Sequence, residues 1–157
     1  MIHGQLPGKL LTDERKDIDL RTHSGVVYPA NCDAMGHMNV QYYVAAFDQA
    51  MWHLVHGLGY QAAWQTEREH GWADVQHFVS FIKELKVGSL FYVESGVVAI
   101  GEKSLTSVHK MFNMDGDLCA RDEIKSVYFD LRQRRGIPLP QTLRDKAEQL
   151  MNPESAT

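Results

Sequence analysis

One long apolar stripe limits what this chain can fold into. Apolar residues recur at spacings of three and four from Val40 to Leu58, the pattern of a single helix of about 18 residues. Asn39 stands where an N-cap belongs, and Gly57 and Gly59 supply the stop. Such a helix is about 27 Å long at 1.5 Å per residue. Because this is long for a chain of 157 residues, we expect the helix to be wrapped on most sides by the rest of the chain.

The segments around this helix have the character of strands. A short strand is predicted over 22–28, closed by Pro29. Four longer strands are predicted near 76–87, 90–100, 104–114 and 118–131. Turn-forming residues separate them and predict hairpins at Gly88, at 101–103 and at Asp115-Gly116. Residues 60–75 are interpreted as an irregular linker with one helical turn, and 141–151 as a short amphipathic helix. The order predicts an α+β architecture of one buried helix on an antiparallel sheet.

Composition narrows the class of protein. The net charge of −4, with both signs mixed along the chain, argues against a nucleic-acid partner. No apolar run approaches the roughly 20 residues of a membrane span, and the first residues lack the layout of a signal peptide. Two cysteines are too few for a disulfide framework. We therefore expect a cytoplasmic protein with a lead-in at 1–20, one domain over 21–151 and a tail at 152–157.

The segment before the helix carries the residues with chemical potential. It reads Asp33-Ala34-Met35-Gly36-His37-Met38-Asn39, and Tyr43 and Phe47-Asp48 follow along the helix. This pattern resembles the signature of the 4-hydroxybenzoyl-CoA thioesterase-like branch of hotdog-fold proteins. That family typically has Asp-Thr-Asp, two residues, Gly-His-Val-Asn-Asn, and then Tyr and Phe-Glu. The resemblance covers roughly residues 20–140, nearly the whole predicted domain.

The resemblance implies a hotdog fold, in which a curved antiparallel sheet wraps a long central helix, and hydrolysis of a small or medium acyl-CoA. Asp33 matches the family's catalytic aspartate, which acts as nucleophile or general base. It lies just before a helix N-terminus, where unpaired amides near Asn39 and Val40 favour an oxyanion. Gly36 lets the loop bring the two together. The resemblance also implies no cofactor beyond the CoA of the substrate, and a homodimer or homotetramer with the acyl pocket at the subunit interface.

Other residues of the motif have two interpretations each. His37 either assists catalysis, by donating to the substrate carbonyl or orienting Asp33, or fills the entry to the helix. Asn39 caps the helix and shapes the oxyanion site. Tyr43 packs in the core with its hydroxyl at the pocket edge. The helix acid of the family is Asp48 here. It is the main rival catalytic carboxylate, but the favoured interpretation is a helix-flank acid bonded to the loop.

The sequence also departs from the family. The first aspartate of the motif is Asn31 here, and the second asparagine after the histidine is Val40. Neither is the catalytic position, but both changes weaken any transfer of the family's substrate preference to this chain.

A thiol nucleophile and a metal site are two alternative kinds of active site for this sequence. Cys32 is interpreted as a small buried residue and not as a thiol nucleophile paired with His37. His53 and His56 share a helix face but have no third partner, so no metal site is expected.

Binding roles elsewhere in the chain stay open. Tyr60, Trp64 and Trp72 either pack the linker onto the sheet, which is favoured, or cage a cation, as in thioesterase domains of carnitine and betaine breakdown. The cations that would bind CoA phosphates are not singled out among Lys83, Lys86, Lys103, Lys110, Arg132, Arg134 and Arg135. Two competing functions remain: a thioesterase acting on acyl carrier protein, and a non-catalytic hotdog protein that only binds or dimerises.

Overall fold

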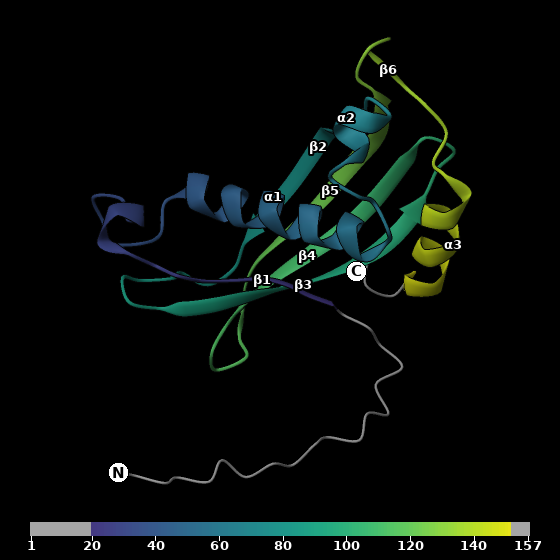
Figure 1. Ribbon diagram of the computed structural model, residues 1–157. Helices are drawn as coiled ribbons and strands as arrows, with labels where there is room; N and C mark the ends of the chain where they lie inside the picture. The colour runs from purple at the N-terminus through teal and green to yellow at the C-terminus, as the bar shows by residue number, and fades with distance from the viewer. Residues whose placement is uncertain (1–19, 152–157) are drawn as a thin grey trace, which may run out of the picture.

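The computed structural model describes residues 20–151, in which one long helix lies across a curved sheet (Figure 1). The elements are β1 (Leu20–Val26), η1 (Pro29–Asn31), α1 (Val40–Gly57), α2 (Trp64–Glu67), β2 (His70–Phe81), β3 (Leu90–Ile100), β4 (Ser104–Asn113), β5 (Leu118–Asp130), β6 (Arg135–Gly136) and α3 (Gln141–Leu150). The sheet order is β1-β3-β4-β5-β2, with β6 added to β5. The tail and the lead-in lie outside the described residues, except Leu20, which begins β1.

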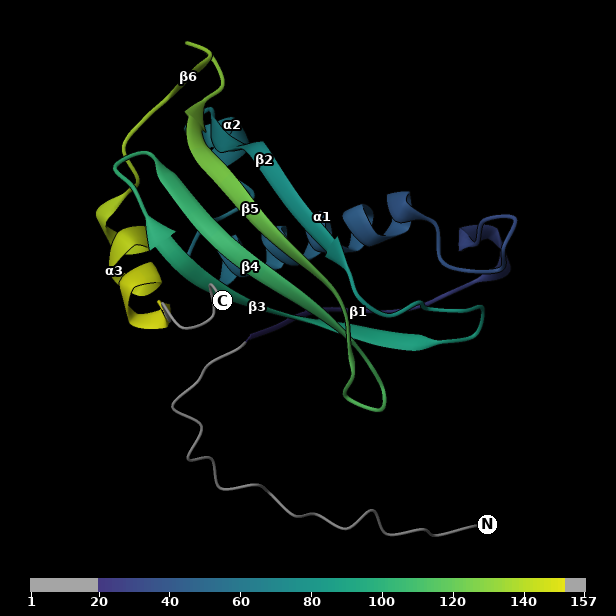
Figure 2. The ribbon, with the colours of Figure 1, turned by 180° about the vertical axis from the view of Figure 1, so that it is seen from behind.

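The long helix begins where its sequence signals predict. The side chain of Asn39 accepts a hydrogen bond from the amide of Gln41 at 3.1 Å. After the helix ends, Gly59 has φ +104°, a backbone conformation that favours glycine. Seven side chains of α1 are buried: Tyr43, Ala46, Phe47, Ala50, Met51, Leu54 and Val55. The sheet curves around this side of the helix (Figures 1 and 2), so the expected α+β hotdog fold is confirmed.

The second strand differs from its predicted position. It runs from His70 to Phe81, whereas the sequence placed a strand near 76–87 and a linker up to residue 75. Residues 70–75 contain few strand-forming side chains, but their backbone pairs with β5, starting at His70 opposite Asp130. The register shifts between Asp74 and Gln76, which marks a bulge at Val75. The helical turn expected in the linker is α2.

The predicted hairpin at Gly88 is wrong. β2 pairs with β5 at one edge of the sheet, whereas β3 pairs with β1 and β4. Residues 82–89, here called the strap, therefore cross from one side of the sheet to the other. The strap is bound to both ends of the loop before α1: Met38 N donates to Leu85 O at 2.8 Å, and Gly88 N donates to Val27 O at 2.8 Å. The hairpins at 101–103 and at Asp115-Gly116 are confirmed.

The C-terminal helix covers the far end of the sheet (Figure 1). α3 agrees with the predicted helix over 141–151, and it buries Leu143 and Ala147. Within residues 20–151, no helix combines the length and the apolar character that crossing a bilayer requires.

Candidate active site

The loop that enters α1 is a tight turn closed by its own backbone. Asp33 N donates to His37 O at 2.9 Å, and Gly36 N donates to Asp33 O at 3.0 Å. Gly36 has φ +79°, which a side-chain-bearing residue adopts only at a cost. The glycine of the motif is therefore required by the turn, as the sequence predicts.

The carboxylate of Asp33 divides its two oxygens between structure and solvent. Oδ1 accepts the amide of Met35 at 2.8 Å and that of His37 at 3.3 Å. Oδ2 receives no hydrogen bond from any residue between 20 and 151. One side chain can therefore serve both the turn and a reaction. The hydrogen bonds to Oδ1 fix the carboxylate in the loop, and Oδ2 keeps its lone pairs free of described hydrogen-bond donors.

The first turn of α1 has one amide without a hydrogen-bond acceptor among the described residues. Asn39 N donates to Asn31 O at 2.8 Å, and Gln41 N is taken by the cap. Val40 N donates to no described residue. The expectation of oxyanion donors near Asn39 and Val40 is therefore narrowed to Val40, because the Asn39 amide is already bonded.

Tyr43 connects α1 to the strap. Its hydroxyl accepts the amide of Leu85 at 3.3 Å, and its ring meets Phe81 edge-on, with 5.2 Å between the centroids. The side chain is buried, and burial raises the pKa of Tyr43 above its ordinary value of 10.0. This agrees with the predicted core position with the hydroxyl at a pocket edge.

The imidazole of His37 turns to the strap and not to Asp33. His37 Nε2 lies 3.1 Å from Glu84 Oε2. If the imidazole is neutral, Nε2 carries the proton that it donates to this carboxylate, and Nδ1 is then an acceptor. His37 touches Asp33 only through its backbone amide. The sequence analysis did not predict a role for Glu84, because no sequence pattern links it to His37, which lies 47 positions earlier.

These residues surround a cavity of about 450 Å³, here called the loop cavity. Its lining is Asp33, Met35, His37, Met38, Val40, Tyr43, Phe81, Ile82, Lys83 and Glu84. The open carboxylate oxygen and the open amide both belong to residues of this lining. In general, a carboxylate can act as a nucleophile or as a base towards water, and a free amide can donate to an oxyanion.

The rival carboxylate and the thiol lie elsewhere. Asp48 is an exposed residue of α1 that does not line the loop cavity. Burial of its carboxyl and, next, the charge of Asp74 raise the pKa of Asp48. Cys32 is half-buried and not fully buried as expected, and its Sγ lies 3.6 Å from Tyr28 O.

The two helix histidines line a second cavity. His53 and His56 share a cavity of about 410 Å³ with Trp52 and Tyr60. Between residues 20 and 151, no three His, Cys, Asp or Glu side chains are grouped so that they could hold a metal ion.

The aromatic residues of the linker pack together. Tyr60 and Trp64 are buried, and the rings of Trp64 and Trp72 both meet Tyr60 edge-on. The guanidinium of Arg68 lies 3.8 Å from the Trp64 ring centroid, where a cation in a cage would lie. The favoured interpretation, that these rings pack the linker onto the sheet, describes what is seen.

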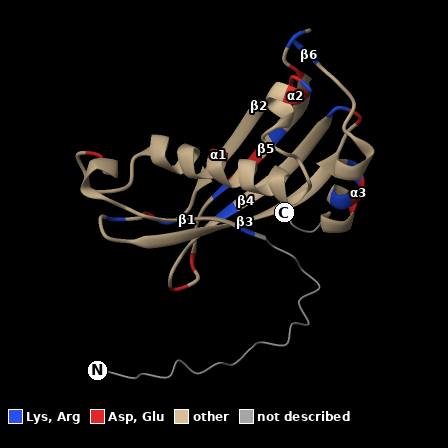
Figure 3. Cartoon of the chain, viewed as in Figure 1, with Lys and Arg blue, Asp and Glu red and all other residues tan. Residues whose placement is uncertain are grey.

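Lys83 is the one Lys or Arg among the described residues that line the loop cavity. Its ammonium pairs with Asp117 on the β4–β5 turn. The hydrogen bond and the charge of Asp117 raise the pKa of Lys83. Figure 3 shows acidic and basic residues interspersed along the chain in this view.

Comparisons with known proteins identify the family of this chain. Residues 27–147 match the family described as the thioesterase-like superfamily. The L-carnitine dehydrogenase/betainyl-CoA thioesterase of Agrobacterium fabrum is 26% identical over 127 residues, which is 81% of this chain. The match covers only 26% of that relative, so the chain spans about that share of its length.

Solved structures share the fold at low identity. A Staphylococcus aureus protein solved in complex with CoA has a TM-score of 0.78 and 16% identity, over 86% of this chain and 88% of that chain. A 1,4-dihydroxy-2-naphthoyl-CoA thioesterase from Synechocystis has a TM-score of 0.72 and 17% identity, over 83% and 96%. Fold and family match agree with the motif from Asp33 to Asn39, and the chain belongs to the thioesterase-like superfamily of hotdog-fold proteins.

Proposed function

We propose that this protein hydrolyses a small or medium acyl-CoA to the free acid and CoA. The observation that carries the proposal is the pair of open groups on one cavity, Asp33 Oδ2 and Val40 N. A cavity of about 450 Å³ suits a small or medium acyl group, since ligand pockets range over roughly 300–1,000 Å³. The family match supports thioester hydrolysis as the reaction class.

The chemistry has two routes that use the same carboxylate. As a nucleophile, Asp33 attacks the thioester carbon, the C–S bond breaks, CoA thiolate leaves, and water then hydrolyses the mixed anhydride. As a general base, Asp33 takes a proton from a water that attacks the carbon directly; the C–S bond then breaks, and the leaving CoA thiolate takes up the proton. In both routes the carbonyl oxygen becomes negative and Val40 N donates to it. Neither route needs a cofactor. His37 would donate to this oxygen only as an imidazolium, because its Nε2 proton faces Glu84.

A panel of acyl-CoAs tests the proposal. Short aliphatic, aromatic and medium-chain esters are incubated with the protein, and release of free CoA thiol is measured. We expect turnover of at least one class, at rates far above those of the Asp33→Asn variant. No release above that variant for any ester would refute the function. The panel also includes an ester of acyl carrier protein. An acidic carrier protein would need a basic docking surface beside the cavity, and the pairing of Lys83 with Asp117 speaks against one.

One small acyl group has specific support. The relative from Agrobacterium carries betainyl-CoA in its name, and betaine has a quaternary ammonium next to the carbonyl. Betainyl-CoA is therefore the second member of the panel to try, beside the neutral short esters.

We also propose a homodimer formed through β2, in the cytoplasm. β2 is one of the two strands at the ends of the sheet order, the other being β1, and it is 12 residues long. An edge strand offers unpaired backbone groups to a second copy. Val75 and Phe78 on this strand are 60% and 63% exposed, and Ile82 just after it is 58% exposed. Exposed apolar side chains along an unpaired edge strand support the proposal that a second copy of the chain covers this edge. The free thiols of Cys32 and Cys119 support a reducing compartment.

A further inference from the structure

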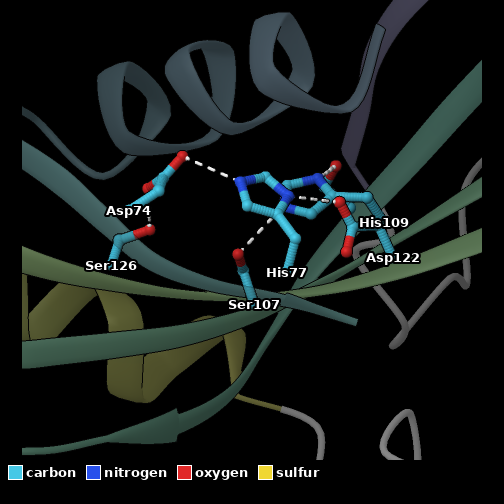
Figure 4. A network of polar contacts seen from close by, with 7 residues as sticks. Asp74, His77, Ser107, His109, Asp122 and Ser126 are labelled. Atoms are coloured by element: carbon cyan, nitrogen blue, oxygen red, sulfur yellow. Dashed lines mark hydrogen bonds and ion pairs between the residues drawn. The ribbon is translucent and has the colours of Figure 1, made fainter. Parts of the chain in front are cut away.

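An acidic cluster lies under α1, away from the groups used above. Figure 4 shows the ring of His77 between two carboxylates of neighbouring strands. His77 Nδ1 lies 2.7 Å from Asp122 Oδ2, and His77 Nε2 lies 3.5 Å from Asp74 Oδ2. Ser126 donates to Asp74 Oδ1 at 2.6 Å. The carboxyl of Asp122 is 0% exposed, whereas His77 and Asp74 keep 28% and 20% of their side chains accessible.

The cluster has more carboxyl groups than cations. Asp48 of α1 lies within electrostatic range of the cluster: after burial, the charge of Asp74 raises the pKa of Asp48 and the charge of His77 lowers it. Two carboxyl groups, those of Asp74 and Asp122, thus contact one imidazole, and a third lies within electrostatic range of it. Burial raises the pKa of Asp122, although its hydrogen bond with His77 opposes this effect. Oδ1 of Asp122 has no hydrogen-bond partner in the described part of the chain, and an unpaired buried carboxyl oxygen is costly unless something else compensates it.

The cluster continues a seam between α1 and β2 that starts at the loop cavity. Phe81 lines that cavity and contacts Tyr43. Side chains on one face of a strand recur at every second residue, so Phe81, Val79 and His77 follow one another along the same face of β2. On the helix, Asp48 comes five residues after Tyr43, about 7.5 Å further along the axis.

An aromatic side chain follows Asp48 on α1. Trp52 lies one helical turn beyond Asp48, and as a hydrogen-bond donor it lowers the pKa of that carboxyl. Trp52 is 38% exposed. Carboxylates attract an organic cation, and an indole face adds cation–π attraction to a quaternary ammonium, whereas a neutral acyl group gains nothing from either.

We propose that the cluster of Asp48, Asp74, His77 and Asp122 binds the cationic end of an acyl group and thereby selects ammonium-bearing acyl-CoAs. This inference rests on the proposed function and names its substrate class. One observation points to a ligand. Asp122 is fully buried, and its Oδ1 has no hydrogen-bond partner among the described residues, whereas the side chains of Asp74 and His77 in the same cluster are partly exposed.

The cluster serves the loop cavity of the partner subunit in the proposed homodimer. Within one chain, Asp48 lies eight residues beyond Val40, about 12 Å along α1, which exceeds the reach of a small acyl group. Two β2 edges paired antiparallel about a twofold axis bring the first half of one strand, with Asp74, beside the second half of the other, with Phe81. The acyl end held in one cavity then meets the cluster of the other subunit.

Matched substrate pairs test the selectivity. Betainyl-CoA is compared with neutral 3,3-dimethylbutanoyl-CoA, and 4-trimethylammoniobutanoyl-CoA with 5,5-dimethylhexanoyl-CoA. We expect kcat/KM to favour at least one cation over its neutral match by 10-fold or more, taking about 1.4 kcal/mol for a charge-assisted contact. Equal rates within both pairs, or faster neutral esters, would overturn the inference while leaving the thioesterase function intact.

Variants locate the site. Asp74→Asn removes one charge but keeps an oxygen for Ser126, and the ratio of kcat/KM for the cationic ester to kcat/KM for its neutral match should fall towards one. Asp145→Asn removes the same charge from exposed α3 and should leave the preference unchanged. A preference that survives Asp74→Asn, or that falls equally in both variants, would refute the assignment.

Two further measurements separate the possible failures. Calorimetric titration with glycine betaine and with 3,3-dimethylbutanoate tests cation binding without thioester chemistry. Selective betaine binding without hydrolysis of any ester would remove the proposed function and keep the cation site. Mixing Asp33→Asn with Asp74→Asn subunits tests the partner arrangement, because a mixed dimer then has one cavity with an intact Asp33 facing an intact cluster. The wild-type preference should return on mixing; its failure to return would contradict sharing between subunits.

Discussion

Asp33 accepts the backbone amide of His37 through Oδ1 at 3.3 Å, and this bond ties the acid to the entrance of α1. The same oxygen accepts Met35 N at 2.8 Å, so the carboxylate cannot swing away from the loop. An asparagine at this position could accept the same two hydrogen bonds through its side-chain oxygen. The Asp33→Asn variant therefore removes the negative charge while it keeps the structural role of the side chain.

Replacing Asp33 by Asn should therefore remove activity without unfolding the protein. Asn keeps an oxygen for the two amides but cannot attack or deprotonate water, and we expect kcat to fall about 1,000-fold or more. Asp48→Asn should cost less for neutral esters, because Asp48 does not line the loop cavity. Thiol release measures both, and thermal melting checks that each variant is folded. A larger loss in Asp48→Asn would transfer the catalytic role to the helix acid.

The bond between Leu85 and Tyr43 gives a stability prediction. Tyr43→Phe leaves the amide of Leu85 without its acceptor in a buried place, which should lower the free energy of unfolding by about 1–3 kcal/mol. Tyr42→Phe is the matched control, because no described residue hydrogen-bonds to the Tyr42 hydroxyl. Urea unfolding of both variants gives the difference. Equal stability of the two variants would mean that the strap does not depend on this bond.

A buried histidine makes the fold sensitive to acid. His109 is 0% exposed, with Nδ1 2.6 Å from Ser95 Oγ and Nε2 2.8 Å from Ser107 Oγ. Burial, and next the charge of His77, lower the pKa of His109 from 6.5 to about 3. Above pH 6.5 neither state binds this proton. Between pH 6.5 and about 3 only the unfolded chain binds it, so the stability falls as the pH falls.

The variant His109→Gln isolates this contribution. As the pH is lowered below 6.5, the free energy of unfolding of the wild type should fall faster than that of the variant. The difference should be up to about 1.4 kcal/mol per pH unit. His77 acts in the opposite direction: burial opposes its charge, but Asp122 and Asp74 outweigh burial and raise the pKa of His77. Its contribution is present below its ordinary pKa and is lost as the pH rises through the raised value. Urea unfolding from pH 7.5 to 4.5 gives both curves, and parallel curves would refute the role of His109.

The helix and its entrance were predictable because their signals are local. The stripe from Val40 to Leu58, the cap at Asn39 and the turn at Gly36 each act within a few residues, and all three are seen. The family motif placed Asp33 in the same loop. Local rules also located the hairpins that join β3 to β4 and β4 to β5.

The missed features depend on contacts between distant residues. The start of β2 at His70 follows from pairing with β5, not from its own side chains. The strap binds the loop through Leu85, and Glu84 meets His37, only after β2 has crossed to the far edge of the sheet. The predicted strands 104–114 and 118–131 include His109 and Asp122, but periodicity does not reveal that a buried position holds a polar group.

The free edge of β2 gives the last prediction, on assembly. Val75 and Phe78 are exposed on a strand whose outer backbone groups have no neighbour in the sheet order. A lysine there opposes strand addition, because its charge must be desolvated when a second copy pairs with the edge. Val75→Lys and Phe78→Lys should shift the protein from dimer to monomer in sedimentation velocity and lower its activity. Met114→Lys, at a similarly exposed position on the β4–β5 turn, should stay dimeric and active. Wild-type protein that sediments as a monomer would exclude the β2 dimer, and edge variants that remain dimeric would assign the interface to another surface.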